Sequence, residues 1–446
     1  MINKNWKKML GMVATLGVVT TGLAACGNSE DKESSDDASG KTKITFWAAP
    51  NPTQYKYWQD MAKEFEKENE NITVEVSQMK ESPSSEATIQ SAVASNTTPT
   101  ISENITRSFA AQLADSKAII PVNDLEHYDD IISERSMDES IKGWAFGDGS
   151  NYVIPVYSNP ILLGWRTDIL AEAGVDKAPT TYTETLDAAK KLKEKYPDKL
   201  LWGKSDGDLT DTTAWLRWFD FFPLYDAASD GNAYVTDGEF VADEAAFTNV
   251  LTFASDLAEE KMVQIGAATD PFENGDAVMT VLGPWNFANW AEKYPELNYQ
   301  ENFDVTAPMV PDDMSDVEMP KTYADAKGIV VYADATEEEQ KAAMEFLNFV
   351  YSDPKHDVEL MEKTNLIPAR DDAVENEAFK EYFDENPEMS VYADYVSNAV
   401  PSMDDARFND IQTILGEQAW VPTLRQEVKA DQAWSDNKKA VEEVLK

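Results

Sequence analysis

Residues 152–165, YVIPVYSNPILLGW, form a long extended and apolar run, and this run decides the fold. An extended chain advances by about 3.3 Å per residue, so the run is long enough to leave one lobe of a protein and enter another. Just before it, Asp148-Gly149 interrupts the segment 144–155 in the way that a hairpin turn does. We therefore predict that the chain passes between two lobes near Val156.

The chain before this run alternates short strands with helices. Residues 43–47 and 72–76 have the alternating pattern of β-strands, and residues 99–101 begin another strand. Between them, residues 57–65 and 87–93 carry apolar side chains at helical spacing. Strands that alternate with helices of this length predict βαβ units and a parallel sheet covered by helices, which places the chain in the α/β class.

The chain after the run continues this alternation and contains no internal repeat. Helices are expected at 183–196, 243–261 and 337–351, with extended segments at 303–308 and 327–332. Extended stretches near residues 156, 305 and 366–368 predict three crossings between lobes. The expected lobes are therefore 43–155 plus 306–362, and 156–305 plus 363–446.

The first 26 residues have the features of a lipoprotein export signal. Three lysines precede a short apolar run, and Leu23-Ala24-Ala25-Cys26 is followed by Gly27. The apolar run is too short for a permanent membrane span. We expect residues 1–25 to be removed, Cys26 to be lipidated, and residues 26–42 to form a flexible linker. The alternative is an ordinary secretory signal with an incidental cysteine.

Composition excludes several classes of function. A net charge of -44 over 446 residues opposes binding to nucleic acid or to an anionic membrane surface. Cys26 is the only cysteine, so no disulfide is expected. The chain has two histidines, His127 and His356, so it offers few histidine ligands for zinc and few bases for histidine-dependent catalysis. We expect no metal and no cofactor.

Three motifs, in chain order, are those of a known family. They are residues 152–170, residues 272–285 (FENGDAVMTVLGPW, matching F-x-x-G-x-A-A-M-x-x-x-G-P-W), and residues 326–331 with a following helix that ends FLNFVYSDP at 346–354. On these motifs the chain resembles extracellular solute-binding proteins of the sugar-binding type. These are the lipoprotein receptors of ABC importers and include maltodextrin-binding proteins. Arg166-Thr167 stands where the family has Asn-Lys, so the identity of the ligand is not carried over.

The resemblance implies a two-lobed periplasmic-binding-protein-like fold with crossing hinge strands and a ligand cleft. It implies a monomeric, lipid-anchored receptor on the extracellular face of the cell membrane, and not an enzyme. Such a receptor closes on a carbohydrate, here an oligosaccharide, and delivers it to an ABC transporter permease. One alternative is glycerol phosphate or another anionic solute, which would need converging cations or helix N-termini. Another is a secreted glycoside hydrolase with paired carboxylates.

Sugar sites need flat apolar faces and hydrogen-bonding side chains, and 12 tryptophans are available here. Trp47 ends the first strand and Asn51 lies in the loop behind it, where open α/β sheets bind ligands. The rigid proline of the Gly-Pro-Trp turn would aim Trp285 outward, although a role in the core is the alternative. Trp215 and Trp218 lie one helical turn apart, and the alternative for both is that they pack within the protein and bind no ligand.

Alignment with the family adds candidates. They are Glu103, Asn104, Asn159, Trp285, Arg407 and Phe408, to which we add Tyr323, ahead of the strand that holds Lys327. Arg407 could equally be a surface residue paired to Asp404 or Asp405. Residues 206–211 (DGDLTD) look like a calcium loop, but the sixth position is Asp211 and the twelfth is Arg217, where such loops have Gly and Glu. We interpret them as an acidic loop near the cleft.

Overall fold

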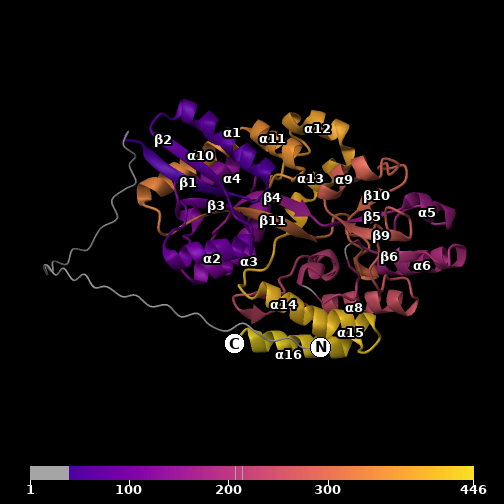
Figure 1. Ribbon diagram of the computed structural model, residues 1–446. Helices are drawn as coiled ribbons and strands as arrows, with labels where there is room; N and C mark the ends of the chain where they lie inside the picture. Colours follow the sequence, from indigo (N-terminus) through magenta and orange to yellow (C-terminus); the bar gives the residue numbers. More distant parts are fainter. Residues whose placement is uncertain (1–39, 206, 213) are drawn as a thin grey trace, which may run out of the picture. The chain divides into compact units, whose positions relative to one another are not determined.

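The first of two main sheets is formed by strands from both halves of the chain. The computed structural model describes residues 40–446, apart from residues 206 and 213 and the side chains of 214–216 (Figure 1). The strand order is β12-β11-β3-β1-β2, and β4 also pairs with β11. The bounds are β1 (Thr42–Ala48), β2 (Ile72–Gln78), β3 (Ile101–Ile105), β4 (Ile154–Pro160), β11 (Thr322–Val331) and β12 (Ala399–Val400).

The expected parallel sheet is parallel only in part. Strand β1 pairs in parallel with β2 and β3, whereas β11 runs antiparallel to β3 and β4. The register of β11 against β4 shifts at Gly328, where a Cβ atom would lie 2.3 Å from the carbonyl oxygen of Ile154. Only glycine fits this close approach of two backbones.

Helices cover this sheet with side chains spaced as expected. Helix α1 (Pro52–Glu68) begins where the Asn51 side chain accepts hydrogen bonds from the amides of Thr53 and Gln54, at 2.8 and 3.2 Å. Phe46 of β1 contacts Phe346 at a ring-centroid distance of 6.3 Å, so a late helix packs on the first strand. The other helices of this part are α2 (Ser85–Ser95), α3 (Arg107–Asp115), α4 (Tyr128–Glu134), α10 (Glu337–Ser352) and α11 (Pro354–Thr364).

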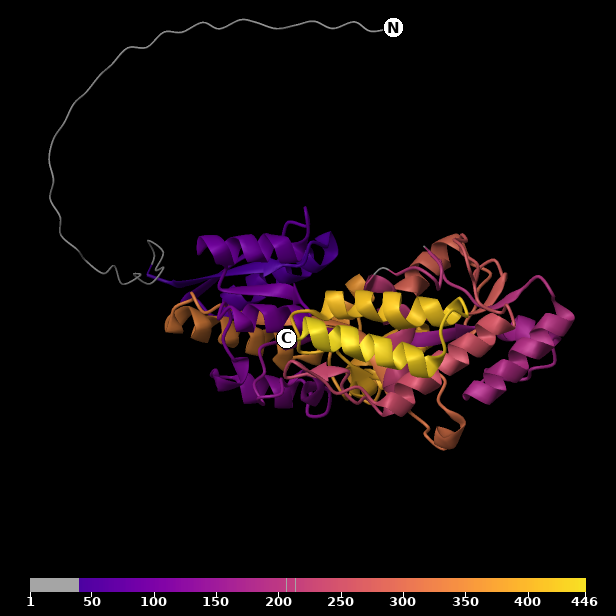
Figure 2. The same ribbon diagram turned by 90° about the horizontal axis from the view of Figure 1, so that it is seen from below.

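The second sheet has four strands in the order β10-β5-β9-β6. Its bounds are β10 (Asp304–Thr306), β5 (Leu162–Trp165), β9 (Ala277–Leu282) and β6 (Leu200–Trp202). A short hairpin of β7 (Val235–Thr236) and β8 (Glu239–Phe240) lies apart from it. Figure 2 shows α16 as a long yellow helix on this part of the protein. The helices are α5 (Thr167–Glu172), α6 (Tyr182–Lys195), α7 (Phe221–Ser229), α8 (Glu244–Glu259), α9 (Trp285–Lys293), α12 (Lys380–Glu385), α13 (Pro387–Asp394), α14 (Phe408–Leu415), α15 (Val421–Leu424) and α16 (Ala430–Val444).

The chain passes between the two sheets within the apolar run 152–165. Strand β4 belongs to the first sheet and β5 to the second, and only Ile161 separates them. A later segment returns beside β4, because Ser158 donates to the carbonyl of Ile367 at 2.9 Å and Ala369 donates to that of Val156 at 3.3 Å. The assignment of the flanking segments to two lobes with the expected boundaries stays a prediction.

The prediction of a hairpin at Asp148-Gly149 is wrong. A turn does form, since the Gly149 amide donates to the carbonyl of Phe146 at 2.8 Å and Gly149 has φ +85°. However, the preceding segment, Ser140–Trp144, is a 3-10 helix named η2 and not a strand. A turn of hairpin composition therefore joins a helix to β4.

Candidate ligand-binding cleft

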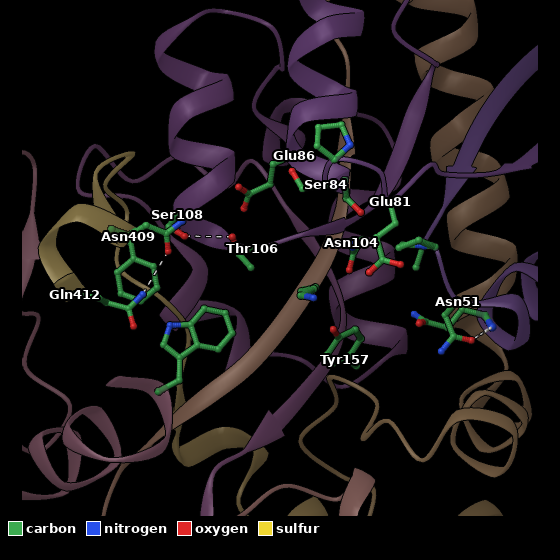
Figure 3. Close-up of a pocket in the computed structure, with 18 of the residues that line it drawn as sticks. Asn51, Glu81, Ser84, Glu86, Asn104, Thr106, Ser108, Tyr157, Asn409 and Gln412 are labelled. Carbon is green, nitrogen blue, oxygen red and sulfur yellow. Dashed lines mark hydrogen bonds between the residues drawn. The ribbon is translucent and has the colours of Figure 1, made fainter. Parts of the chain in front are cut away.

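A cleft of about 820 Å³ lies at the carboxyl ends of the parallel strands β1, β2 and β3 (Figure 3). This volume falls within the range of about 300–1,000 Å³ that is typical of small-molecule sites. Lining residues come from the segments after these three strands, from β4 and β11, and from η3 (Ala214–Phe219) and α14. The residues are Ala49, Pro50, Asn51, Pro52, Gln54, Glu81, Pro83, Ser84, Ser85, Glu86, Asn104, Thr106, Ser108, Tyr157, Trp218, Lys327, Phe408, Asn409 and Gln412.

The wall after β1 is held from behind by Glu103. This carboxylate is fully buried. Its two oxygens accept hydrogen bonds from the Ala49 amide at 2.8 Å and from the Gln54 side chain at 2.9 Å. Burial raises the pKa of Glu103, and these hydrogen bonds oppose that shift. Glu103 does not line the cleft, but it positions two residues that do.

Charges in the cleft are mixed, with an excess of acid. Lys327 of β11 is the one cationic residue among the lining residues that the structure describes, and Glu81 and Glu86 also line the cleft. Burial raises the pKa of Glu86, and the positive charge of Lys327 lowers it. Burial likewise raises the pKa of Asp325, two residues before Lys327, and Lys327 again opposes the shift. The amine therefore lies in an acidic surrounding.

Aromatic rings form one side of the cleft. Trp218 of η3 packs between two rings, stacked with Phe408 at 6.0 Å and tilted to Tyr323 at 5.5 Å. Trp218 and Phe408 keep only 6% and 3% of their surfaces exposed, so the rings are firmly held. Figure 3 shows Asn409 and Gln412 near Ser108, and they line the same cleft as Trp218 and Phe408. Amide groups and aromatic faces thus lie next to each other.

An ion pair joins α3 to the segment before α14 close to the cleft. Arg107 and Asp404 lie 3.2 Å apart, with 13% and 3% of their side chains exposed. Asp404 also accepts from the Gly147 amide at 3.0 Å. Beside them, the Ser108 amide donates to the Ser402 hydroxyl at 3.1 Å. The two sides of the cleft are therefore linked at Ser108, a lining residue.

The structure brings four of the site residues predicted from the sequence together in the cleft, namely Asn51, Asn104, Trp218 and Phe408. Sequence reasoning missed the segment 81–86, Tyr157, Lys327, Asn409 and Gln412. The signal that could have found the segment 81–86 is its place after β2, by the same strand-end rule that selected Asn51.

Other candidates lie behind the cleft or away from it. Trp47 is half-buried against the core, and Tyr323 is buried behind Trp218. Asn159 is fully buried, and its side-chain oxygen accepts from the Ile367 amide at 3.0 Å. Arg407 is partly exposed and forms an ion pair with Asp405 at 2.7 Å, as expected from the alternative in which Arg407 does not contact a ligand. Arg407 also donates to the carbonyl of Leu445 at 2.9 Å.

Trp285 does not line the cleft either. It is the first residue of α9 and is 37% exposed. Its ring meets Phe219, the neighbour of Trp218, at 6.1 Å in an edge-on arrangement. The ring also folds over Gly283, where a Cβ atom would lie 2.1 Å from Cη2 of the indole. Trp285 is therefore not a core residue, and its ring contacts the residue that follows Trp218 in the chain.

Three expectations from the sequence concern residues that the structure does not describe. The side chain of Trp215, the lipidation site Cys26 and Asp206 of the acidic loop lie outside the described residues. Within that loop, the Asp208 carboxylate accepts hydrogen bonds from the amides of Thr210 at 2.6 Å and Gly266 at 3.0 Å. Over the described part of the chain, no group of three or more acidic, histidine or cysteine side chains is arranged to hold a metal ion.

Comparisons with known proteins agree with this architecture. Residues 60–389 match the family described as bacterial extracellular solute-binding protein. A crystal structure of an uncharacterized protein from Listeria monocytogenes EGD-e is 62% identical, covers 91% of this chain and 100% of its own, and superposes with a TM-score of 0.89. The cyclic α-maltosyl-1,6-maltose binding protein from Arthrobacter globiformis is 20% identical over 91% of this chain and 99% of its own, with a TM-score of 0.75.

A curated relative carries a different ligand in its name. The sn-glycerol-3-phosphate-binding periplasmic protein UgpB of Brucella abortus is 23% identical over 257 residues. The chain spans about half the length of the curated relatives it matches, 54% of the UgpB sequence.

Among the helices that the structure describes, none has both the length and the apolar character needed to span a membrane. With 330 matched residues and a two-lobed α/β fold around a cleft, the chain belongs to the bacterial extracellular solute-binding proteins.

Proposed function

We propose that this protein is a lipid-anchored receptor that captures an oligosaccharide in the cleft and delivers it to an ABC transporter permease. The observation that carries the proposal is the lining of the cleft. Amides and hydroxyls from Asn51, Ser84, Asn104 and Asn409 line the same space as the rings of Trp218 and Phe408. Hydroxyl-rich rings with apolar faces need this combination of groups.

The charge of the cleft supports a neutral ligand over an anionic one. A phosphate is held by several cations or by helix N-termini. The N-termini of α1, α2 and α3 do line this cleft, but the one lining cation, Lys327, shares it with Glu81 and Glu86, and these two carboxylates oppose an anion. Opposing carboxylates raise the free energy of bringing in a further negative charge. The similarity to UgpB keeps sn-glycerol 3-phosphate as the second candidate, because Lys327 supplies one cation for it.

The mechanism that we propose is closure of two lobes, with 43–155 plus 306–362 on one side and 156–305 plus 363–446 on the other. Each side contributes part of the lining, so a ligand that contacts both sides favours the closed state. Lipidation at Cys26 would keep the receptor at the outer face of the cell membrane. The ligand would leave the protein chemically unchanged, which separates a receptor from a glycoside hydrolase.

The test is calorimetric titration of the mature protein with linear and cyclic α-glucans and, separately, with sn-glycerol 3-phosphate. We expect a neutral glucan to bind, and Asn409→Ala, which alters an exposed lining amide of α14, to weaken its binding about tenfold. The matched control is Asp410→Ala, its exposed neighbour outside the lining. Binding of the phosphate alone would contradict the proposal, and release of shorter sugars from the titrated glucan would indicate a hydrolase.

A further inference from the structure

A second and smaller cavity lies away from the cleft, between α9, the loop that follows it, and α13. Its volume is about 320 Å³, at the lower end of the small-molecule range. Figure 1 labels α9 and α13 next to each other in this part of the protein. The lining residues that carry the argument are Phe287, Trp290, Tyr299, Phe303 and Glu388. None of them lines the cleft described above.

The walls of this cavity are aromatic. Phe287 is stacked with Phe303 at a ring-centroid distance of 6.2 Å and meets Trp290 edge-on at 5.8 Å. Tyr299 contributes another ring, 5.9 Å from Phe303. Trp290 and Phe303 are each 2% exposed and support the wall from behind, so the half-buried rings of Phe287 and Tyr299 are the ones with surface open to the cavity. The faces of such rings attract cations through their quadrupoles.

Glu388 supplies the one acidic group in this lining, as far as the structure describes it. It is half-buried in the first turn of α13, and within the described residues it forms no ion pair and no hydrogen bond with another side chain. Burial raises the pKa of Glu388, and a hydrogen bond from its own backbone amide opposes that shift. Burial also raises the pKa of Tyr299 and of Tyr392, and the negative charge of Glu388 adds to both shifts. An acidic residue in the first helical turn is favourable by itself. However, this position gives the Glu388 carboxylate no counterion, and the carboxylate lies beside the aromatic wall of the cavity.

We propose that this cavity binds a small organic cation of the alkylammonium class, with the ammonium group between the aromatic rings and the Glu388 carboxylate. A carboxylate that is partly shielded from water, as that of Glu388 is, gains from a cation that pairs with it. An alkylammonium ion supplies both the missing charge and apolar surface for Phe287 and Tyr299. Quaternary ammonium ions are recognised elsewhere by aromatic cages of this kind. The proposal is independent of the carbohydrate cleft.

The test compares choline chloride with its neutral carbon analogue, 3,3-dimethyl-1-butanol, on the mature protein at constant ionic strength. Binding is followed by calorimetry and by the fluorescence of the aromatic side chains. We expect choline to bind in the millimolar range and the neutral alcohol to bind at least tenfold more weakly. Glu388→Gln, which keeps the shape of the side chain, should also weaken choline binding at least tenfold.

The matched control is Glu296→Gln, which removes the same charge from an exposed residue of the neighbouring loop that is not part of the lining. This variant should bind choline like the unmodified protein. Equal binding of choline and the neutral alcohol, an equal effect of the two Glu→Gln variants, or no choline binding at all would each overturn the proposal. A melting curve for every variant separates loss of the site from loss of the fold.

Discussion

Replacing Asp357 by Asn should destabilise the protein strongly, because two buried arginines depend on this carboxylate. Arg135 donates to it at 3.0 and 2.7 Å, and Arg370 donates at 3.1 Å. Exposure of the three side chains is 0–2%. Arg135 also donates to the carbonyls of Pro155 and Val156 at the start of the chain crossing.

The magnitude follows from what each arginine keeps after the change. Arg370 retains Asp372, which accepts from it at 2.6 and 3.0 Å. Arg135 loses its ionic partner and retains two backbone carbonyls, the sulfur of Met137 at 4.0 Å, and the ring of Tyr351, 3.9 Å from its guanidinium carbon. Breaking a buried ion pair costs about 3–5 kcal/mol, and because only one arginine is left unpaired we expect about 3 kcal/mol for Asp357→Asn.

Urea unfolding followed by circular dichroism measures this loss. The control is Asp384→Asn, whose carboxylate pairs with Lys380 at 2.6 Å while 64% of it is exposed. An exposed pair contributes at most about 1 kcal/mol, so the control should unfold almost like the original protein. If Asp357→Asn lost no more stability than Asp384→Asn, the reasoning from burial and missing partners would be refuted.

Three further predictions concern other parts of the chain. Trp285→Ala should weaken oligosaccharide binding about tenfold, because it removes a ring next to Phe219 that can stack on the ligand. The melting temperature should change little, because the ring is 37% exposed. An early melt with normal binding would mark the ring as structural. Burial raises the pKa of Asp226 well above its usual value, so folding favours its neutral form, and the stability this contributes is lost as the pH rises. Asp226→Asn should therefore be more stable than the original protein in urea at pH 7 and gain nothing below about pH 4, the ordinary pKa of Asp; an equal effect at both pH values would argue against titration. Cys26→Ala should leave the protein unlipidated, as mass spectrometry and membrane fractionation would report, and unchanged membrane retention would contradict the lipoprotein interpretation.

Local patterns predicted the strands and helices well, and long-range pairing was harder to predict. The alternation in residues 43–47 and the helical spacing in 57–65 depend on neighbours in the sequence, and both elements are present as β1 and α1. The antiparallel placement of β11 depends on β3 and β4, which are far away in the chain. No local signal distinguishes a parallel from an antiparallel partner in such a case.

The candidate site shows the same division. The strand-end rule and the family alignment selected Asn51, Asn104 and Phe408, which line the cleft. Glu103 and Asn159 were selected as ligand contacts, but both are buried and bind backbone amides instead. A polar residue that binds a ligand and one that binds its own backbone look alike in a sequence. The segment 81–86 was missed for the opposite reason, since its polar composition resembles any exposed loop.

The pairing of β11 with β3 has a consequence for how the protein is made. Ser102 and Tyr332 share a hydrogen bond at 2.8 Å across 230 residues of chain. During synthesis, β3 therefore precedes β11, its antiparallel partner, by about half of the polypeptide, and this edge of β3 stays unpaired until then. Contacts of such long range slow folding, and unpaired edges favour aggregation and proteolysis. The first sheet of this topology can therefore be completed only after most of the chain has been made.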